Sequence, residues 1–234
     1  MMRSLGVITA RGGSKRLPRK NVKQLLGKPL IAYIIEAALN SSLDKVLVST
    51  EDDEIAELAK KFGADVPFKR PDELAEDYAS NEAVLLHALD WLSEHRSEEY
   101  DIVVKMQPTT PFVLPESINA CIDSVKNTDA ACCFAARAAA DPPQWIFGLD
   151  RHMHAHTLLG DKLVGDLVHS QHLDKYFFPT GAAYAVRVEE LRKQKCVFAE
   201  PTRLIEMDPL RSIDIDDDID FAMAEIVGRK LGIA

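Results

Sequence analysis

Residues 5–10 read LGVITA, and residues 11–21, which follow directly, read RGGSKRLPRKN. The first run is short, apolar and partly β-branched, so it predicts a buried strand. The second run places two glycines and five lysines and arginines in eleven residues. In an open α/β sheet, ligands bind beyond the carboxyl ends of the strands. Together the two runs predict the first strand of such a sheet, with a ligand-binding loop at its end.

The rest of the chain alternates between strand-like and helix-like segments. Short β-branched runs occur at 45–50, 101–106, 130–135 and 181–188, and apolar residues recur at helical spacing in 29–38, 52–62, 80–95, 115–126 and 216–231. This alternation is typical of a parallel sheet with crossover helices. We therefore predict a single α/β domain over residues 1–234, with a Rossmann-like, mostly parallel sheet flanked by helices. Residues 137–180 break the alternation and are expected to form a projecting arm or a small subdomain.

Two helices allow more detailed expectations. Pro29 is expected at the first position of its helix, where a fixed φ and a missing N–H cost nothing. In the terminal helix, Ile219, Ala222 and Ile226 recur at helical spacing, and Arg229 and Lys230 form a basic end.

The composition excludes several classes of function. The chain has 234 residues, 47% of them hydrophobic, and a formal net charge of −9. This acidic balance disfavours nucleic acids and membrane surfaces as partners, because both require a basic field. No run reaches the roughly 18 apolar residues of a membrane span, and the first apolar run is too short for a signal segment, so we expect a cytoplasmic protein. The cysteines lack C-x-x-C spacing and are expected to be buried free thiols: Cys121, Cys132, Cys133 and Cys196.

The basic loop has the composition of a triphosphate-binding site. Gly12 and Gly13 let backbone N–H groups approach phosphate oxygens, while lysines and arginines neutralise the charge of phosphoryl chemistry. Neither common phosphate loop is present, because Gly27-Lys28 is followed by proline and no G-x-G-x-x-G occurs. The alternative, a solvated basic turn, is disfavoured by a glycine pair directly after a strand.

Five motifs in order resemble one enzyme family. They are residues 10–21 with GKPL at 27–30, RPDELAED at 70–77, QPTTP at 107–111, GAAY at 181–184 and SIDID at 212–216. In these motifs the chain resembles the acylneuraminate cytidylyltransferases, also called CMP-sialic acid synthetases. The resemblance implies a nucleotidyltransferase-type fold with a dimerisation arm, and a homodimer. It also implies transfer of CMP from CTP to the anomeric hydroxyl of a 2-keto-3-deoxy sugar acid, with release of pyrophosphate.

The resemblance further implies roles for individual residues. Arg70 and Ser80 would contact the cytosine or ribose, and Gln107 and Thr109 would face nucleotide and sugar. Tyr184 would bind substrate. Loop residues would bind the CTP phosphates, with Arg11 and Lys15 acting in catalysis: Arg11, Gly13, Ser14, Lys15, Lys20 and Asn21. Taken alone, Arg70 could equally form a surface ion pair with Asp72 or Glu73.

Asp214 and Asp216 form the candidate metal site. They alternate with Ile213 and Ile215, so on an extended segment both carboxylates point to one face. Two hard oxygen donors suit Mg²⁺, which takes one or two carboxylates and completes its shell with water and phosphate oxygens; Mn²⁺ is a possible substitute. The rival carboxylates are expected to cap the terminal helix instead: Asp217, Asp218 and Asp220.

Three positions depart from the sialate-specific members, which carry Arg, Arg and Asn where this chain has Ser170, Phe178 and Thr180. Because arginine forks usually pair with a sugar carboxylate, the departure disfavours N-acetylneuraminate itself. Another nonulosonate, legionaminate-like or pseudaminate-like, or an octulosonate stays open. A non-catalytic nucleotide-binding protein is the alternative from another class, although such a protein does not need paired metal ligands.

The arm region is rich in histidines and aromatics. His152, His154 and His156 would share one face of a strand, a spacing that could bind zinc, but an exposed edge strand is favoured because no acidic or cysteine partner adjoins it. His169 and His172 lie near the diverged positions and could contact the sugar or lie on the surface. Four aromatics are expected at a dimer contact: Trp145, Phe147, Phe177 and Phe178.

Overall fold

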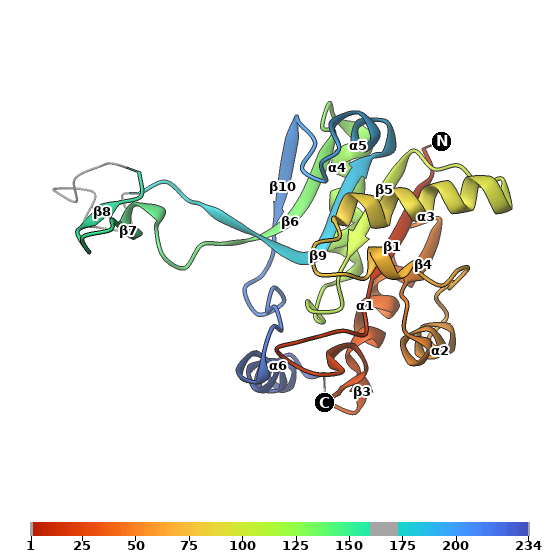
Figure 1. The fold of residues 1–234 in the computed structure, drawn as a ribbon, viewed down its shortest axis with the longest axis horizontal. Coiled ribbons are helices and arrows are strands. Elements are labelled where there is room, and N and C mark those ends of the chain that lie inside the picture. Colours follow the sequence, from red (N-terminus) through yellow and green to blue (C-terminus); the bar gives the residue numbers. More distant parts are fainter. Residues whose placement is uncertain (1, 160–172, 234) are drawn as a thin grey trace.

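Six strands form the central sheet of the computed structural model, which describes residues 2–159 and 173–233. Their order is β10-β6-β9-β5-β1-β4, and neighbouring strands are parallel except where β9 pairs with β5 and β6. The strands are β1 (Ser4–Thr9), β4 (Lys45–Ser49), β5 (Ile102–Met106), β6 (Cys132–Ala138), β9 (Phe177–Arg187) and β10 (Thr202–Glu206). The expected mostly parallel α/β sheet is confirmed (Figure 1).

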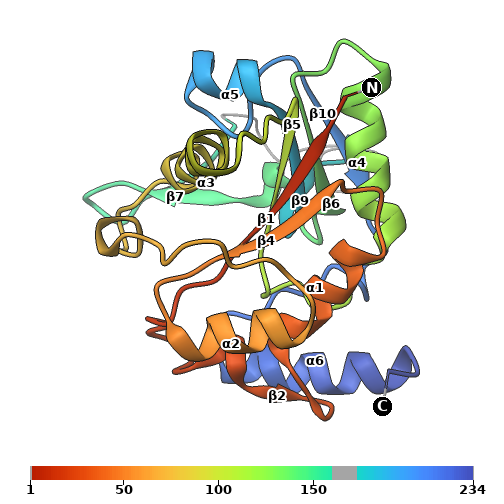
Figure 2. The same cartoon turned by 90° about the vertical axis from the view of Figure 1, so that its right-hand side faces the viewer.

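Helices cover both faces of this sheet (Figure 2). Apolar side chains of α1 (Leu30–Leu39), α2 (Asp53–Lys61) and α4 (Pro115–Asn127) pack in the core of one face, and those of α3 (Asn81–Arg96) and α5 (Val188–Gln194) pack on the other. Successive side chains of a strand point to opposite faces of the sheet, so Val7 packs on the α3 side and Ile8 on the α1 side. The strands β1, β4 and β5 are mostly apolar because both of their faces are buried, whereas the edge strand β10 is largely exposed.

The C-terminal helix α6 (Asp218–Lys230) buries apolar residues other than those that mark it as a helix in the sequence. Ile219 and Ile226 are 74% and 59% exposed, and Ala222 is exposed as well. Phe221 and Val227 instead pack in a third apolar cluster beside α1. Two apolar stripes interleave on this helix, and spacing alone cannot decide which one meets the aromatic cluster.

The acidic cap of α6 is the one expected, although the helix begins at Asp218 and not at Asp216. Asp217 caps the helix by accepting hydrogen bonds from the backbone N–H groups of Ile219 and Asp220, at 2.9 and 3.0 Å. The Asp220 carboxylate accepts from the backbone N–H of Asp217, which completes a capping box. Asp218 stands in the first turn, where its charge favours the helix dipole.

The chain between β6 and β9 projects from the body as an arm (Figure 1). Its shaft consists of the outer ends of these two strands, which pair as far as Ala138 and Phe177. Both strands therefore extend beyond the expected ranges of 130–135 and 181–188. After the turn η3 (Pro143–Trp145), a small hairpin of β7 (Phe147–Leu149) and β8 (Ala155–Thr157) forms the far end.

The arm histidines do not share one strand face. His156 lies in β8, whereas His152 and His154 flank Met153 in a turn where φ is +64°. Nδ1 of His154 lies 3.3 Å from the Asp150 carboxylate, so an acidic neighbour is present after all. Within residues 2–159 and 173–233, no group of three or more His, Cys, Asp and Glu side chains could hold a metal. The positions 169 and 172 lie outside the described residues.

Pro29 is the last residue of a hairpin and lies just before α1, so it is not the first helical residue as expected. β2 (Gln24–Leu25) and β3 (Lys28–Pro29) pair around Leu26 and Gly27, whose φ angles are +47° and +81°. Pro29 is extended, with ψ 139°, and serves as the residue before α1. The remaining short turns are η1 (Lys20–Val22) and η2 (Asp72–Leu74).

Two composition-based expectations concern the core and the membrane. Cys121, Cys132 and Cys133 are buried free thiols as expected, while Cys196 is half-buried and also free. None of the helices in the described part of the chain combines the length and apolar character that a membrane span needs.

Candidate functional site

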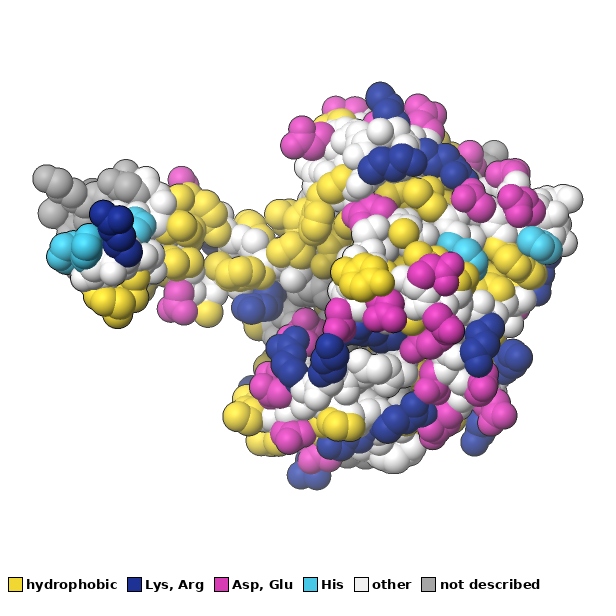
Figure 3. Space-filling view, in the orientation of Figure 1, with side chains coloured by type: hydrophobic (Ala, Val, Ile, Leu, Met, Phe, Trp, Pro, Cys, Tyr) yellow, Lys and Arg dark blue, Asp and Glu magenta, His cyan; other side chains and the backbone are white. Residues whose placement is uncertain are grey.

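A cavity of about 570 Å³ opens at the carboxyl ends of β1 and β5. It is lined by most of the residues expected in the site: Arg11, Ser14, Lys15, Lys20, Asn21, Arg70, Gln107, Thr109, Asp214 and Asp216. Basic and acidic side chains gather around the recess in the middle of the body (Figure 3). These residues come from distant parts of the chain and meet because β1 and β5 are neighbours in the sheet.

The basic loop is anchored at both of its ends. The backbone N–H of Gly12 donates to Oε1 of Glu51, in the loop after β4, at 2.7 Å. Asn21 is 6% exposed, and its Nδ2 donates to the carbonyl of Arg11 at 2.9 Å. This second bond closes the loop on itself, so Asn21 supports the loop from inside while also lining the cavity.

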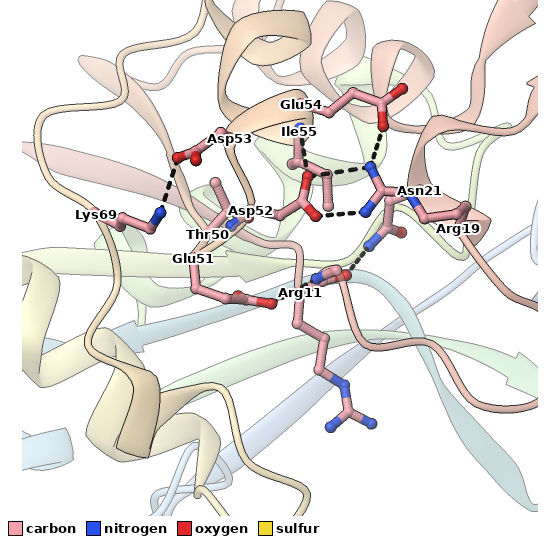
Figure 4. Close-up of polar contacts among 11 residues, drawn as sticks. Arg11, Arg19, Asn21, Thr50, Glu51, Asp52, Asp53, Glu54, Ile55 and Lys69 are labelled. Atoms are coloured by element: carbon pink, nitrogen blue, oxygen red, sulfur yellow. Dashed lines mark hydrogen bonds and ion pairs between the residues drawn. The ribbon is translucent and has the colours of Figure 1, made fainter.

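Arg19 holds the loop against the start of α2 (Figure 4). It adopts a left-handed backbone with φ +58°, and its guanidinium pairs with the carboxylates of Asp52 and Glu54. That guanidinium is the main reason why the pKa of Asp52 is lowered. Asp52 also caps α2 by accepting from the N–H of Ile55 at 3.0 Å. One carboxylate therefore fixes both the loop and the helix.

The two loop glycines differ in their surroundings. A Cβ on Gly12 would lie 2.5 Å from Oδ2 of Asp52, so no larger residue fits beside that carboxylate. A Cβ on Gly13 would meet nothing within 4 Å. Gly12 is therefore required by packing, whereas Gly13 is left free to give a ligand access to the backbone.

Asp77 pairs with two cations of the loop. Its Oδ1 lies 2.7 Å from the Arg11 guanidinium, and its Oδ2 pairs with Nζ of Lys15. Hydrogen bonds from Lys15 and then Arg11 lower the pKa of the Asp77 carboxyl. Both cations thus meet at one anion inside the cavity, although Lys15 itself is 76% exposed and free to move toward a ligand.

Arg70 is buried in the cavity wall, with only 4% of its surface exposed. Its Nε donates to Oγ of Ser49 at 3.0 Å, and its terminal nitrogen donates to the carbonyl of the same residue. Burial lowers its pKa to about 10, against an opposing effect of the nearby Glu51 carboxylate. The alternative of a surface ion pair with Asp72 or Glu73 is therefore wrong.

The segment that carries Asp214 and Asp216 is fastened to the loop after β5 and to the basic loop. Ile215 between them is fully buried, and its backbone N–H donates to the carbonyl of Thr109 at 2.9 Å. Nζ of Lys20 donates to the carbonyl of Ile215 at 2.7 Å. Both carboxylates line the cavity, so the expected alternation of core and cavity side chains is confirmed.

Asp216 faces cations of the basic loop. A terminal nitrogen of Arg16 lies 2.9 Å from its Oδ2, and Nζ of Lys20 lies 3.6 Å from its Oδ1. Asp214 acts at longer range. The pKa of Tyr184 is raised to about 12, first by burial and then by the negative charge of Asp214. The cavity therefore presents a cationic wall and an anionic wall to the same space.

The anionic wall has the donor chemistry of a magnesium site. Two carboxylates on one face of an extended segment match the ligand number that Mg²⁺ usually takes from a protein. No third His, Cys, Asp or Glu completes such a cluster within the described ranges. The residues therefore fit a cation that fills its remaining positions with water and phosphate oxygens.

Three expected site residues do not line the cavity. Gly13 stands beside it, Ser80 is exposed and caps α3 by accepting from the N–H of Ala83 at 3.1 Å, and Tyr184 is buried in the sheet. Asn81, next to Ser80, does line the cavity.

Phe178 and Thr180, at two of the diverged positions, make contacts within the protein. Phe178 is half exposed, with the Arg137 guanidinium 5.2 Å from its ring centre. Thr180 is buried and donates to the carbonyl of Ala135 at 3.0 Å. The third position, Ser170, lies outside the described residues.

Sequence reasoning assigned no role to Arg16, Asp77 and Asn81, which the structure places in the cavity. Arg16 and Asp77 could have been found, because they lie within two of the ordered motifs. Asn81 carries no such signal, since its position depends on how α3 begins after its cap.

Comparisons with known proteins agree with this geometry. The cytidylyltransferase family model matches residues 5–215. The CMP-N,N'-diacetyllegionaminic acid synthase of Legionella pneumophila is 35% identical, over 96% of this chain and 95% of the relative. The pseudaminic acid cytidylyltransferase of Campylobacter jejuni is 34% identical, over 97% and 96%.

A solved structure shares the fold. The CMP:2-keto-3-deoxy-manno-octonic acid synthetase, determined in complex with CTP, superposes with a TM-score of 0.69 at 18% identity and covers 98% of this chain and 99% of that one. The family match spans most of the chain and includes every residue that lines the cavity except Asp216. The chain belongs to the cytidylyltransferase family.

Proposed function

We propose that this protein transfers CMP from CTP to the anomeric hydroxyl of a 2-keto-3-deoxy sugar acid, a nonulosonate similar to sialic acid, and releases pyrophosphate. One observation carries the proposal: a single cavity is lined both by the basic loop and by the Asp214–Asp216 pair that contacts this loop. The names of the relatives, which concern legionaminic and pseudaminic acids, support the class of acceptor. The family match and the relatives place the enzyme among cytidylyltransferases, and we infer that it works in the cytoplasm.

The reaction needs little covalent chemistry from the protein. The anomeric oxygen attacks the α-phosphorus of CTP, the bond from that phosphorus to the bridging oxygen of the β-phosphate breaks, and the hydroxyl proton leaves to solvent or a base. Arg11, Lys15 and Lys20 line the cavity and would neutralise the charge that accumulates on the departing pyrophosphate. Arg70 would provide a fixed, desolvated cation behind them.

We propose Mg²⁺, with Mn²⁺ as a substitute, as the cofactor held by Asp214 and Asp216. When bound, the cation would supply charge stabilisation for the phosphate oxygens. Lys20 bonds to the backbone between these two residues, so the protein itself keeps both carboxylates aimed into the cavity.

The test is pyrophosphate release with CTP, Mg²⁺ and a panel of acceptors: N-acetylneuraminate, N,N'-diacetyllegionaminate, pseudaminate and 3-deoxy-manno-octulosonate. We expect a nonulosonate to be the best acceptor, and CTP to exceed UTP, ATP and GTP. Asp214→Ala and Lys15→Ala should reduce kcat by about 100-fold or more, because each removes charge stabilisation from the transition state. The controls Asp218→Ala and Lys230→Ala change exposed residues of α6 and should retain activity.

Two outcomes would contradict this proposal. Exclusive use of the octulosonate would favour the alternative acceptor class. Binding of CTP without turnover of any acceptor would favour a non-catalytic nucleotide-binding protein.

We propose further that the arm serves a homodimer. Phe147 and Leu149 stand 51% and 59% exposed on one face of β7, and Phe178 stands half exposed on the shaft. Figure 3 shows hydrophobic side chains along the arm and where it leaves the body. Apolar surface of this kind is stable when a second copy covers it.

A further inference from the structure

Lys105 is a buried lysine in the middle of the central sheet. It lies on β5 between Val104 and Met106 and is 4% exposed. Its Nζ lies 4.5 Å from the ring centre of Tyr184, its cross-strand neighbour on β9. Among the described residues, no carboxylate forms an ion pair with this ammonium group. A strand buried on both faces rarely carries a charge unless the charge has a partner.

Lys105 does not itself line the cavity of the candidate site, but the chain that follows it does. Gln107 follows two positions later, so it lies on the same side of the chain, and it lines the cavity. The charges that act on Lys105 come from Glu82, in the first turn of α3, and from Asp214. Burial outweighs both and lowers the pKa of Lys105 to about 8. An anion next to Nζ would offset this cost.

The position of Lys105 also indicates which substrate it faces. The basic loop follows β1, and β5 separates β1 from β9 in the sheet. Nζ of Lys105 lies over the ring of Tyr184 on β9, the strand on the other side of β5 from β1. With the nucleotide phosphates in the loop, the acceptor would lie near Gln107, which lines the cavity and whose backbone N–H donates to the carbonyl of Gly181 on β9 at 2.9 Å. On that side Phe178 and Thr180 carry no charge, so Lys105 is the buried cation available there.

We propose that Lys105 binds the carboxylate of the acceptor sugar and so determines that the acceptor is an acid. The inference rests on the proposed CMP transfer and adds a specificity-determining residue to it. Val103 and Val104 precede Lys105 in an apolar strand, and a methionine at position 105 would satisfy the same packing without the charge. The lysine is therefore explained by recognition of a ligand and not by the needs of the fold.

The experiment compares an acid with its neutral analogue. N,N'-Diacetyllegionaminate and its C1 carboxamide are used as acceptors for the wild-type protein, Lys105→Met and Lys105→Arg, and kcat/KM is measured with saturating CTP. The wild type should prefer the acid by about 10- to 100-fold, the range expected of a charge-assisted hydrogen bond. Lys105→Met should lose this preference, whereas Lys105→Arg should retain most of it.

The KM for CTP and the urea midpoint separate recognition from structure. Both should stay close to wild type in Lys105→Met, because methionine preserves the volume and removes a buried charge. If Lys105→Met still prefers the acid as strongly as the wild type does, the role of Lys105 is overturned while CMP transfer stands. If the wild type releases no pyrophosphate with any acceptor of the panel above, the proposed function itself fails.

Discussion

At the scale of single residues, the cations of the site are already paired in the free chain. Asp77 binds Arg11 and Lys15, and Asp216 faces Arg16 and Lys20. A triphosphate must displace some of these contacts before it can use the same cations. The internal carboxylates therefore keep the loop in place and also compete with the ligand.

Asp77→Asn is predicted to strengthen CTP binding, because it removes the anion that competes for Arg11 and Lys15. At low ionic strength we expect a Kd lower by about 2- to 10-fold, which corresponds to the contribution of one or two exposed ion pairs. Stability should stay close to that of the wild type, because both ion pairs are exposed to solvent. Calorimetric titration measures the affinity, with Glu94→Gln on the exposed face of α3 as control. A weaker affinity for Asp77→Asn would mean that this carboxylate positions the cations.

At the scale of elements, the loop after β1 depends on the start of α2. Asp52 caps that helix and pairs with Arg19, and it leaves no room for a side chain at position 12. A substitution that disturbs the start of α2 should therefore also disturb the loop, and the reverse should hold as well.

Gly12→Ala and Gly13→Ala are predicted to fail in different ways. Gly12→Ala forces a methyl group against Asp52 and should destabilise the protein by about 1–3 kcal/mol, as overpacking does. Gly13→Ala meets no atom of the free chain, so its stability should stay within about 0.5 kcal/mol while its affinity for CTP falls. Urea unfolding and CTP titration of both variants provide the measurement. Equal loss of stability in the two variants would contradict the assignment of Gly12 to packing and of Gly13 to ligand access.

Five strands of the central sheet and five helices were predictable, because each has an apolar run or a helical period of its own. The exposed edge strand β10 and the short helix α5 were not expected, since neither has a strong apolar pattern. The alternation around Ile215 likewise predicted that Asp214 and Asp216 share one face. The buried face of α6 was not predictable, since Ile219 and Phe221 belong to two apolar stripes of similar length. Nor was the burial of Arg70, which depends on the close approach of the chain after α2 to Ser49. Periodicity describes each element, whereas packing between elements decides such positions.

At the scale of the whole molecule, the body and the arm have different surfaces. The body buries its apolar residues on both sides of the sheet, whereas the arm is a ribbon with a hairpin at its end and has little to pack against (Figures 1 and 2). Apolar side chains remain exposed on that hairpin. A second copy of the chain would cover these side chains.

The arm is predicted to control the oligomeric state. The double variant Phe147→Asp, Leu149→Asp places two charges on one face of β7 and should convert a dimer to a monomer, as measured by light scattering during size exclusion. The control Ile226→Asp changes an equally exposed apolar residue on α6 and should leave the dimer intact. A wild-type monomer at all concentrations would refute the dimer, and dissociation by the control alone would place the interface at α6.

The central claim is CMP transfer in a cavity with a basic wall and a carboxylate wall, and phosphorus NMR of the reaction tests it most directly. CTP, Mg²⁺ and the best acceptor should give one new phosphodiester resonance and an equal amount of pyrophosphate, and Asp214→Ala should give neither. CDP or inorganic phosphate as the initial product, or an unchanged product yield in Asp214→Ala, would contradict the claim.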